Sequence, residues 1–226
     1  MIAENVHKVL NEIAGGNAYG EAVTLVAATK TRTPDEINEA IAAGVADVGE
    51  NRVQEFRDKY ALVQGARRHF IGHLQTNKVK YLIGKCDLIH SLDRFELADE
   101  LQKRAEKADW VANCLIEINI GSELSKSGFS RDDALQTYER LRRYPNIRLL
   151  GLMGMLPISE DMQYLRSLCL SMREIYDTIR VRDNAFCHLS MGMSGDWRLC
   201  VECGSNMIRL GTTLFGPRTV QAPVND

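Results

Sequence analysis

The chain has 226 residues, 45% of them hydrophobic and 26% charged, and a formal net charge of −2. These values are ordinary for a globular protein with a sizeable core, and they give no global electrostatic reason to expect nucleic acid or a membrane surface as a partner. No apolar run approaches the length of a membrane span, so we expect a protein of the cytoplasm.

The N-terminal segment predicts an amphipathic helix and not a secretory signal. Lys8 and Glu12 interrupt it with charge, while Val6, Val9 and Ile13 recur at helical spacing. We therefore expect an extra helix ahead of the first strand.

Eight short and mostly apolar segments follow, each typical of a strand buried on both faces. They are residues 22–29, 46–49, 68–72, 87–91, 113–120, 147–155, 186–190 and 207–211. Helical patterns lie between them. The clearest begins with the capping box Thr33-Pro34-Asp35-Glu36 and can end at Gly44. Similar starts are predicted at Asp93 with Glu96 and at Ser130 with Asp133, and further helices at 160–180 and after Ser194.

Strands that alternate with helices indicate a parallel sheet, and eight such units favour closure into a (β/α)₈ barrel. The alternative is an open doubly wound sheet, which needs a glycine-rich turn after its first strand, and the sequence has none there. No linker or low-complexity stretch divides the chain, so we expect a single α/β domain over residues 1–226.

Functional groups of such barrels lie at the carboxyl ends of the strands, and phosphate sites often follow strands seven and eight. Here the loop after strand seven contains Gly192, Ser194 and Gly195, and the next loop begins with Gly211 and Thr212. Glycines allow close backbone approach, and helix N-termini present unpaired N–H groups. Simple turns could explain either loop alone, but the two together favour a phosphate site.

Two cations stand at the same end of the predicted barrel. Arg209 demands a partner, which could be Glu50 or an anionic or nitrogen-bearing ligand. Lys30 ends the first strand, where desolvation and nearby positive groups make an amine nucleophilic. A nucleophilic lysine that faces a phosphate site suggests a Schiff base with either pyridoxal 5′-phosphate or a sugar phosphate, and the pattern does not choose between them.

Six cysteines are scattered through the chain, and Cys200 and Cys203 have C-x-x-C spacing. No second pair of that kind and no H-x-x-x-H accompanies them, so buried reduced thiols are favoured over a metal site.

Seven motifs in order resemble those of the pyridoxal-phosphate homeostasis protein family: AATKTR, GENRVQEF, HFIGHLQTNK, SKSG, GLMGM, LSMGMSGD and IRLGTTLFGPR. The resemblance runs from about residue 22 to 218. The family is similar to the barrel domain of alanine racemase, of fold type III, but lacks its second β-domain. It therefore implies a single (β/α)₈ TIM-type barrel with an extra N-terminal helix.

The resemblance implies that pyridoxal 5′-phosphate is the cofactor. Lys30 would form the internal aldimine, Arg209 would face the pyridine nitrogen, and Asn51 would line the pocket. Ser194, Gly211 and Thr212 would hold the phosphate, and Met155 and Ser190 would complete the pocket lining. No catalytic residue and no metal is implied.

Family members are thought to buffer or deliver the cofactor in vitamin B6 homeostasis, without established catalytic turnover, so recipient apo-enzymes are candidate partners. An arginine keeps the ring nitrogen unprotonated, and no tyrosine stands at a predicted strand end to act as a second acid–base group. The alternatives are a racemase that uses Lys30 with His73 or His90, and a Schiff-base aldolase. We expect a monomer, since the second domain is absent.

Overall fold

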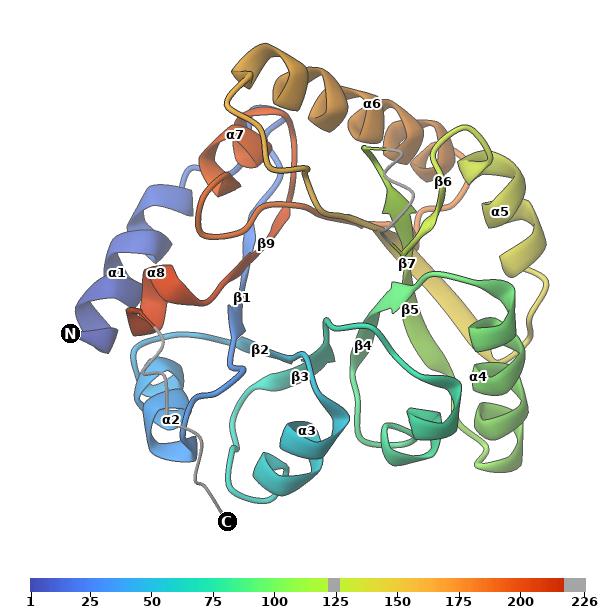
Figure 1. Ribbon diagram of the computed structural model, residues 1–226, viewed down its shortest axis with the longest axis horizontal. Coiled ribbons are helices and arrows are strands. Elements are labelled where there is room, and N and C mark those ends of the chain that lie inside the picture. Colours follow the sequence, from blue (N-terminus) through green and yellow to red (C-terminus); the bar gives the residue numbers. More distant parts are fainter. Residues whose placement is uncertain (122–126, 218–226) are drawn as a thin grey trace.

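Eight parallel strands close into a barrel in the computed structural model, which describes residues 1–121 and 127–217 (Figure 1). They are β1 (Thr24–Ala28), β2 (Asp47–Glu50), β3 (Arg67–Phe70), β4 (Leu88–Leu92), β5 (Ala112–Asn119), β7 (Ile147–Gly154), β8 (His188–Ser190) and β9 (Met207–Leu210). Their order is β4-β3-β2-β1-β9-β8-β7-β5, and pairing of β4 with β5 closes the ring. The predicted single barrel is confirmed.

The helices surround the ring of strands, and the extra α1 packs against α2 and α8 (Figure 1). The helices are α1 (Ile2–Ile13), α2 (Pro34–Ala42), α3 (Val53–Lys59), α4 (Phe95–Lys107), α5 (Ala134–Leu141), α6 (Met162–Arg180), α7 (Trp197–Glu202), α8 (Thr212–Phe215) and the 3-10 helix η1 (Thr76–Tyr81). None within the described ranges is long and apolar enough to cross a membrane.

Local sequence accounts well for α2. The Thr33 side chain accepts the backbone N–H of Glu36, the Glu36 carboxylate accepts that of Thr33, and Pro34 occupies the first turn. Gly44 follows with φ +111°, a left-handed conformation that glycine adopts without strain. The predicted start and end of this helix are confirmed.

The two other predicted capping pairs are wrong, because Asp93 and Ser130 make other contacts. Asp93 binds the side chains of Arg94 and His73, and α4 begins after Arg94 with no side-chain cap. Ser130 belongs to β6 (Phe129–Ser130), a short strand that pairs with β5 and that the sequence pattern did not indicate. The short elements α3, η1 and α8 were also not predicted.

The barrel interior is apolar in one layer and polar in the rest. Val26, Leu88, Leu115, Met153 and Met207 form a buried cluster contributed by five strands. Side chains alternate along a strand, so residues two positions further along β4, β5 and β9 also point inward. Those residues are His90, Glu117 and Arg209, all of them buried.

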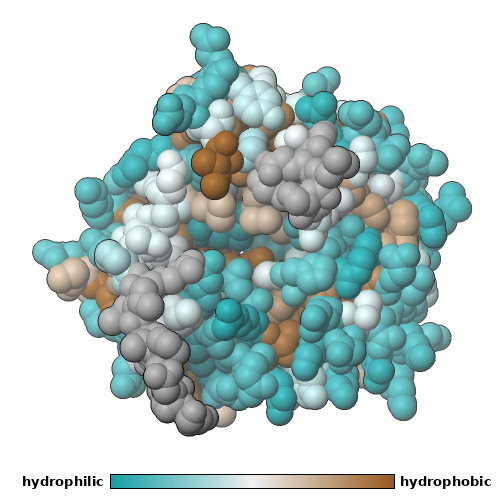
Figure 2. Space-filling view, in the orientation of Figure 1, coloured by the Kyte–Doolittle hydropathy of each residue, from teal (hydrophilic) through white to brown (hydrophobic). Residues whose placement is uncertain are grey.

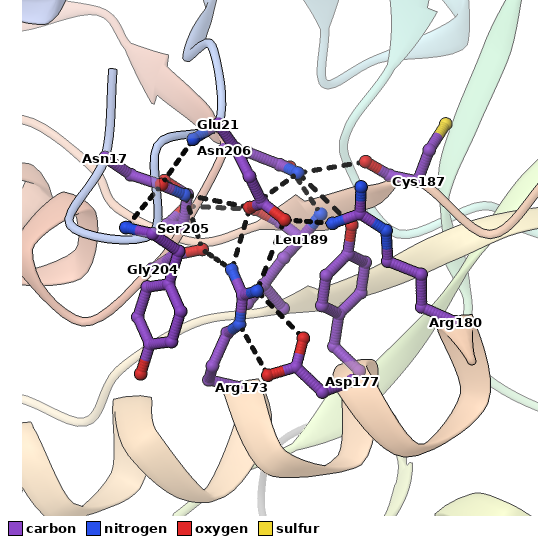
Figure 3. A network of polar contacts seen from close by, with 12 residues as sticks. Asn17, Glu21, Arg173, Asp177, Arg180, Cys187, Leu189, Gly204, Ser205 and Asn206 are labelled. Atoms are coloured by element: carbon purple, nitrogen blue, oxygen red, sulfur yellow. Dashed lines mark hydrogen bonds and ion pairs between the residues drawn. The ribbon is translucent and has the colours of Figure 1, made fainter. Parts of the chain in front are cut away.

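At the N-terminal ends of β8 and β9 a second polar network joins the loop before β1 to α6 (Figure 3). Glu21 accepts hydrogen bonds from Arg173, at 2.7 Å, and from Arg180. Asn17 and Asn206 also donate to Glu21 and to nearby backbone carbonyls. This cluster ties the barrel together at the end opposite to the predicted site.

Residues 122–126 and 218–226 lie outside the described residues. Part of the SKSG motif, and the end of the family resemblance at residue 218, therefore fall outside them.

Candidate functional site

A cavity of about 240 Å³ opens where β1, β9 and the loop after β8 meet. Figure 2 shows that the surface in this view is mostly hydrophilic, with small hydrophobic patches. The cavity is lined by Ala28, Lys30, Arg32, Met193, Ser194, Gly195, Arg209, Gly211 and Thr212. This lining contains three cationic side chains and no carboxylate, so it suits an anionic ligand.

Lys30 leaves the end of β1 into this cavity, and the backbone next to it is strained. Thr31 has φ +65°, which is rare for a β-branched residue. Its N–H donates to the Glu55 carboxylate at 2.8 Å, which fixes the turn from the other side. The capped helix α2 begins three residues further on. The backbone at Lys30 is therefore held by β1 on one side, and by the Thr31–Glu55 hydrogen bond and the start of α2 on the other.

A hydrogen bond at the cavity wall joins the loop after β8 to the first turn of α8. The Ser194 hydroxyl accepts the N–H of Thr213 at 3.2 Å. Gly195 and Thr212 line the same wall. Hydroxyl and backbone N–H groups from two neighbouring loops are what a phosphate binds.

Gly192 is required for close packing of the loop after β8 against Trp197 of α7. Its φ is +106°, and a Cβ there would lie 2.8 Å from the Cα of Trp197. It does not line the cavity, whereas Gly195 does and has open space around it. Of the two glycines predicted to admit a ligand, only Gly195 lies where that is possible.

Arg209 is buried in the barrel and is not paired with Glu50. Its Nη1 donates to the carbonyl and hydroxyl oxygens of Ser190, at 2.9 and 2.5 Å, and its Nη2 donates to Gly154 O at 3.0 Å. Glu50 instead accepts from Thr29 at 2.6 Å and from Lys59 at 2.7 Å. Burial lowers the pKa of Arg209, but a guanidinium keeps its proton at any physiological pH.

Five of the eight predicted site residues line the cavity: Lys30, Ser194, Arg209, Gly211 and Thr212. Ser190 is fully buried behind Arg209, and Met155 follows β7 with 37% of its surface exposed. Asn51 lines a neighbouring cavity of about 260 Å³ together with His73. These three residues therefore do not line the first cavity.

Arg32 and Glu117 are polar residues near the site that the sequence interpretation missed. Arg32 lines the cavity and donates to the carbonyl oxygens of Gly216 and Pro217. Its position two residues after Lys30 was the available signal. Burial, followed by the charge of Asp93, raises the pKa of Glu117 to about 7, although Arg209 and Arg94 oppose this. An isolated acidic residue within an apolar strand was the signal for Glu117.

All six cysteines are free, and five of them are buried, as predicted. Cys200 Sγ lies 3.8 Å from Cys169 Sγ. Cys187 is the exception, since it is exposed.

The chain is similar to known proteins over nearly its whole length. The family model described as alanine racemase, N-terminal domain, matches residues 3–219. A pyridoxal phosphate homeostasis protein of Aquifex aeolicus is 42% identical over 220 residues, which cover 96% of this chain and 95% of that protein. The Escherichia coli K12 protein of the same name is 36% identical, with 96% and 97% covered. The chain belongs to the pyridoxal phosphate homeostasis protein family.

Solved structures agree with this membership. PipY of Synechococcus elongatus PCC7942, crystallised with PLP bound, is 28% identical and superimposes with a TM-score of 0.82 over 96% of this chain and 100% of PipY. Alanine racemase of Corynebacterium glutamicum has a TM-score of 0.77 at 16% identity, and the match covers 96% of this chain but 61% of the racemase. The latter likeness shows a shared barrel fold.

Proposed function

We propose that this protein holds pyridoxal 5′-phosphate at the mouth of its barrel and serves vitamin B6 homeostasis by buffering or delivering the cofactor, without catalytic turnover. The observation that carries the proposal is that Lys30, Arg209 and the Ser194–Thr212 wall line one cavity. Membership of the homeostasis protein family and the PLP-bound structure of PipY support it.

The residues present fit this cofactor. Bound pyridoxal phosphate supplies an aldehyde that condenses reversibly with a primary amine, a phosphate dianion and a pyridine nitrogen that accepts a hydrogen bond. Lys30 supplies the amine, and Ser194, Gly195 and Thr212 supply hydroxyl and N–H donors to the phosphate. Arg209 only donates, so it holds its own proton and leaves the ring nitrogen unprotonated.

The same geometry favours holding over catalysis. No tyrosine lines the cavity within residues 1–121 and 127–217. His90, one of two histidines considered as a base for racemisation, is fully buried and bonded to His69 and Ser190. His73, the other, is exposed, lines the neighbouring cavity and contacts Asp93. Racemisation needs a second acid–base group on the opposite face of the ligand, and none of these residues lines the Lys30 cavity.

Titration of the purified protein with pyridoxal phosphate tests the proposal. Wild type is expected to develop the absorbance band of a lysine adduct, and Lys30→Ala is expected to lose it. Lys80→Ala removes an exposed lysine on η1, outside the cavity lining, and should titrate as wild type does. An unchanged band in Lys30→Ala would refute the assignment of Lys30. Deuterium incorporation at the α-carbon of alanine or serine would refute the non-catalytic role.

A further inference from the structure

A line of hydrogen bonds crosses the barrel interior from its N-terminal end to Arg209. His69 Nε2 lies 3.0 Å from an Asp47 carboxylate oxygen, and His69 Nδ1 lies 2.9 Å from His90 Nε2. His90 Nδ1 lies 3.2 Å from the Ser190 hydroxyl, which accepts from Arg209. These five residues, the interior network, come from five different strands, and each is at least nine-tenths buried.

When both histidine rings are neutral, the two ends of the interior network dictate the direction of every bond in it. A guanidinium only donates and a carboxylate only accepts. Ser190 therefore accepts from Arg209 and donates its own proton to His90 Nδ1. His90 then donates from Nε2 to His69 Nδ1, and His69 donates from Nε2 to Asp47. Both rings are neutral Nε2–H tautomers in this arrangement.

The Asp47 end is held by an ion pair near the surface. Arg67 donates to both carboxylate oxygens, at 2.6 and 2.7 Å. Burial is the largest cause that lowers the pKa of His90 well below its usual range, which agrees with a neutral ring. The Asp47 carboxylate is thus held in place as the final acceptor of the interior network.

Arg209 needs such an arrangement because its acidic neighbour inside the barrel gives incomplete compensation. That neighbour is Glu117. Burial raises the pKa of its carboxyl group to about 7, so the group is only partly ionised at neutral pH. The aligned interior network presents the negative end of a dipole, the Ser190 oxygen, to the guanidinium. Because the Arg209 guanidinium donates to Ser190 and to Gly154 O, it is held in one orientation at the cavity.

We propose that Asp47, His69 and His90 are positioning residues, which hold Ser190 as an acceptor and thereby fix the orientation of Arg209 toward the ligand cavity. They act through Arg209 and do not touch the ligand themselves. The part of this inference that concerns pyridoxal phosphate rests on the proposed function, but the part that concerns Arg209 does not.

Replacement of Asp47 by asparagine should reverse the network. The amide oxygen of the new side chain would take the place of Oδ2 and accept from Arg67 Nη2. The NH₂ group would take the place of Oδ1 and face His69 Nε2, and the bond from Arg67 Nε would be lost. His69 would then carry its proton on Nδ1, and His90 on Nδ1 in turn. The Ser190 hydroxyl would receive two donors and lose its acceptor. This is the same tautomer argument that explains the effect of an asparagine beside the histidine of a serine protease.

The matched control is Asp87→Asn. Asp87 lies just before β4, at the same end of the barrel, and its carboxylate accepts the backbone N–H of Arg68 at 2.6 Å. It has no place in the interior network. Ser190→Ala is a second test, because it cuts the link to Arg209 but leaves Asp47 to hold the tautomers of His69 and His90.

The experiment uses ¹⁵N-labelled protein without ligand, followed by titration with pyridoxal phosphate. Two-bond ¹H–¹⁵N spectra should show Nε2–H tautomers for His69 and His90 in wild type, Asp87→Asn and Ser190→Ala, and Nδ1–H tautomers in Asp47→Asn. The guanidinium N–H signals of Arg209, identified by their loss in Arg209→Lys, should exchange with water at least ten times faster in Asp47→Asn and Ser190→Ala. The same two variants should bind pyridoxal phosphate roughly ten times more weakly, since a fixed donor lowers the cost of binding.

An Nδ1–H tautomer of either histidine in wild type overturns the inference. So does a tautomer change in Asp47→Asn that leaves Arg209 exchange at the wild-type rate. If Asp47→Asn does not fold, Ser190→Ala decides the question by its Arg209 exchange rate. The wild type could show slow exchange of the Arg209 N–H protons and yet develop no absorbance band with pyridoxal phosphate. That result would support the interior network and refute the proposed function.

Discussion

The hydroxyl of Ser194 accepts the backbone N–H of Thr213 at 3.2 Å, so one hydrogen bond joins the loop that follows β8 to the first turn of α8. Both segments line the cavity that Lys30 enters. A ligand phosphate in the cavity would meet donors whose relative positions are already set. Pre-organisation of this kind lowers the entropy cost of binding.

Ser194→Ala should weaken binding of pyridoxal phosphate by roughly ten- to a hundredfold, because a hydrogen bond to a charged group contributes about 1.5–3 kcal/mol. The lysine adduct should still form at saturating ligand, and its absorbance band should be unchanged. Equilibrium titration measures both quantities. Ser167→Ala, in α6 and away from the cavity, is the control. Equal affinities for the two variants would argue against Ser194 as a phosphate ligand.

Gly192→Ala should lower the free energy of unfolding by about 1–3 kcal/mol, because φ is +106° and the new Cβ would meet the Trp197 backbone. Gly195→Ala should change stability far less, since nothing lies within 4 Å of its Cβ position. Urea unfolding of the two variants compares a packing glycine with one in open space. The prediction fails if the two variants lose equal stability.

Glu21→Gln should cost about 2 kcal/mol, because it leaves Arg173 and Arg180 short of a carboxylate at the base of the barrel (Figure 3). Glu174→Gln, on the exposed side of α6, is the control and should stay within about 0.5 kcal/mol of wild type. Thermal and urea denaturation give the difference. A control variant as unstable as Glu21→Gln would show that α6 itself, and not the network, is sensitive.

The stability of the protein should fall as pH drops from about 4 toward 2. Burial alone raises the pKa of Asp47, but hydrogen bonds from His69 and Arg67 and the charge of Arg67 outweigh it and hold that pKa at about 2. A carboxyl group with a depressed pKa stabilises the fold above its unfolded pKa and loses that contribution as pH falls through the folded value. The contribution is about 2 kcal/mol.

Urea unfolding of wild type and Asp47→Asn across pH 2–7 tests this. The difference in stability between the two proteins should shrink by about 2 kcal/mol from the upper end of that range to the lower. A difference that stays constant with pH would show that Asp47 is not depressed in the folded state.

Cys187 should be the first cysteine to react with iodoacetamide in the native protein, because it is exposed and the others are buried. Burial also raises the pKa of Cys86 to about 12, which suppresses its thiolate. Mass spectrometry after brief labelling, with and without urea, identifies the modified peptides. Rapid native labelling of Cys200 or Cys203 would show that α7 opens readily.

The sequence by itself determined the barrel, the extra helix and the strand ends that carry function. Buried parallel strands give continuous apolar runs, and the capping box of α2 is a local signal that survives in the structure. Because the carboxyl ends of parallel strands share one face, Lys30, Ser194, Arg209, Gly211 and Thr212 could be expected together, and the structure places them in one cavity.

Only the tertiary structure decided which polar groups pair inside the barrel. Asp93 and Ser130 resemble helix caps in the sequence, but Asp93 contacts His73, and the backbone of Ser130 pairs with β5. Arg209 could have paired with Glu50, yet it faces Ser190, and through it a pair of histidines from β3 and β4. Sequence spacing reports periodicity and local bonds, whereas the partner of an inward-pointing side chain depends on strand register and barrel closure, which the whole chain sets at once.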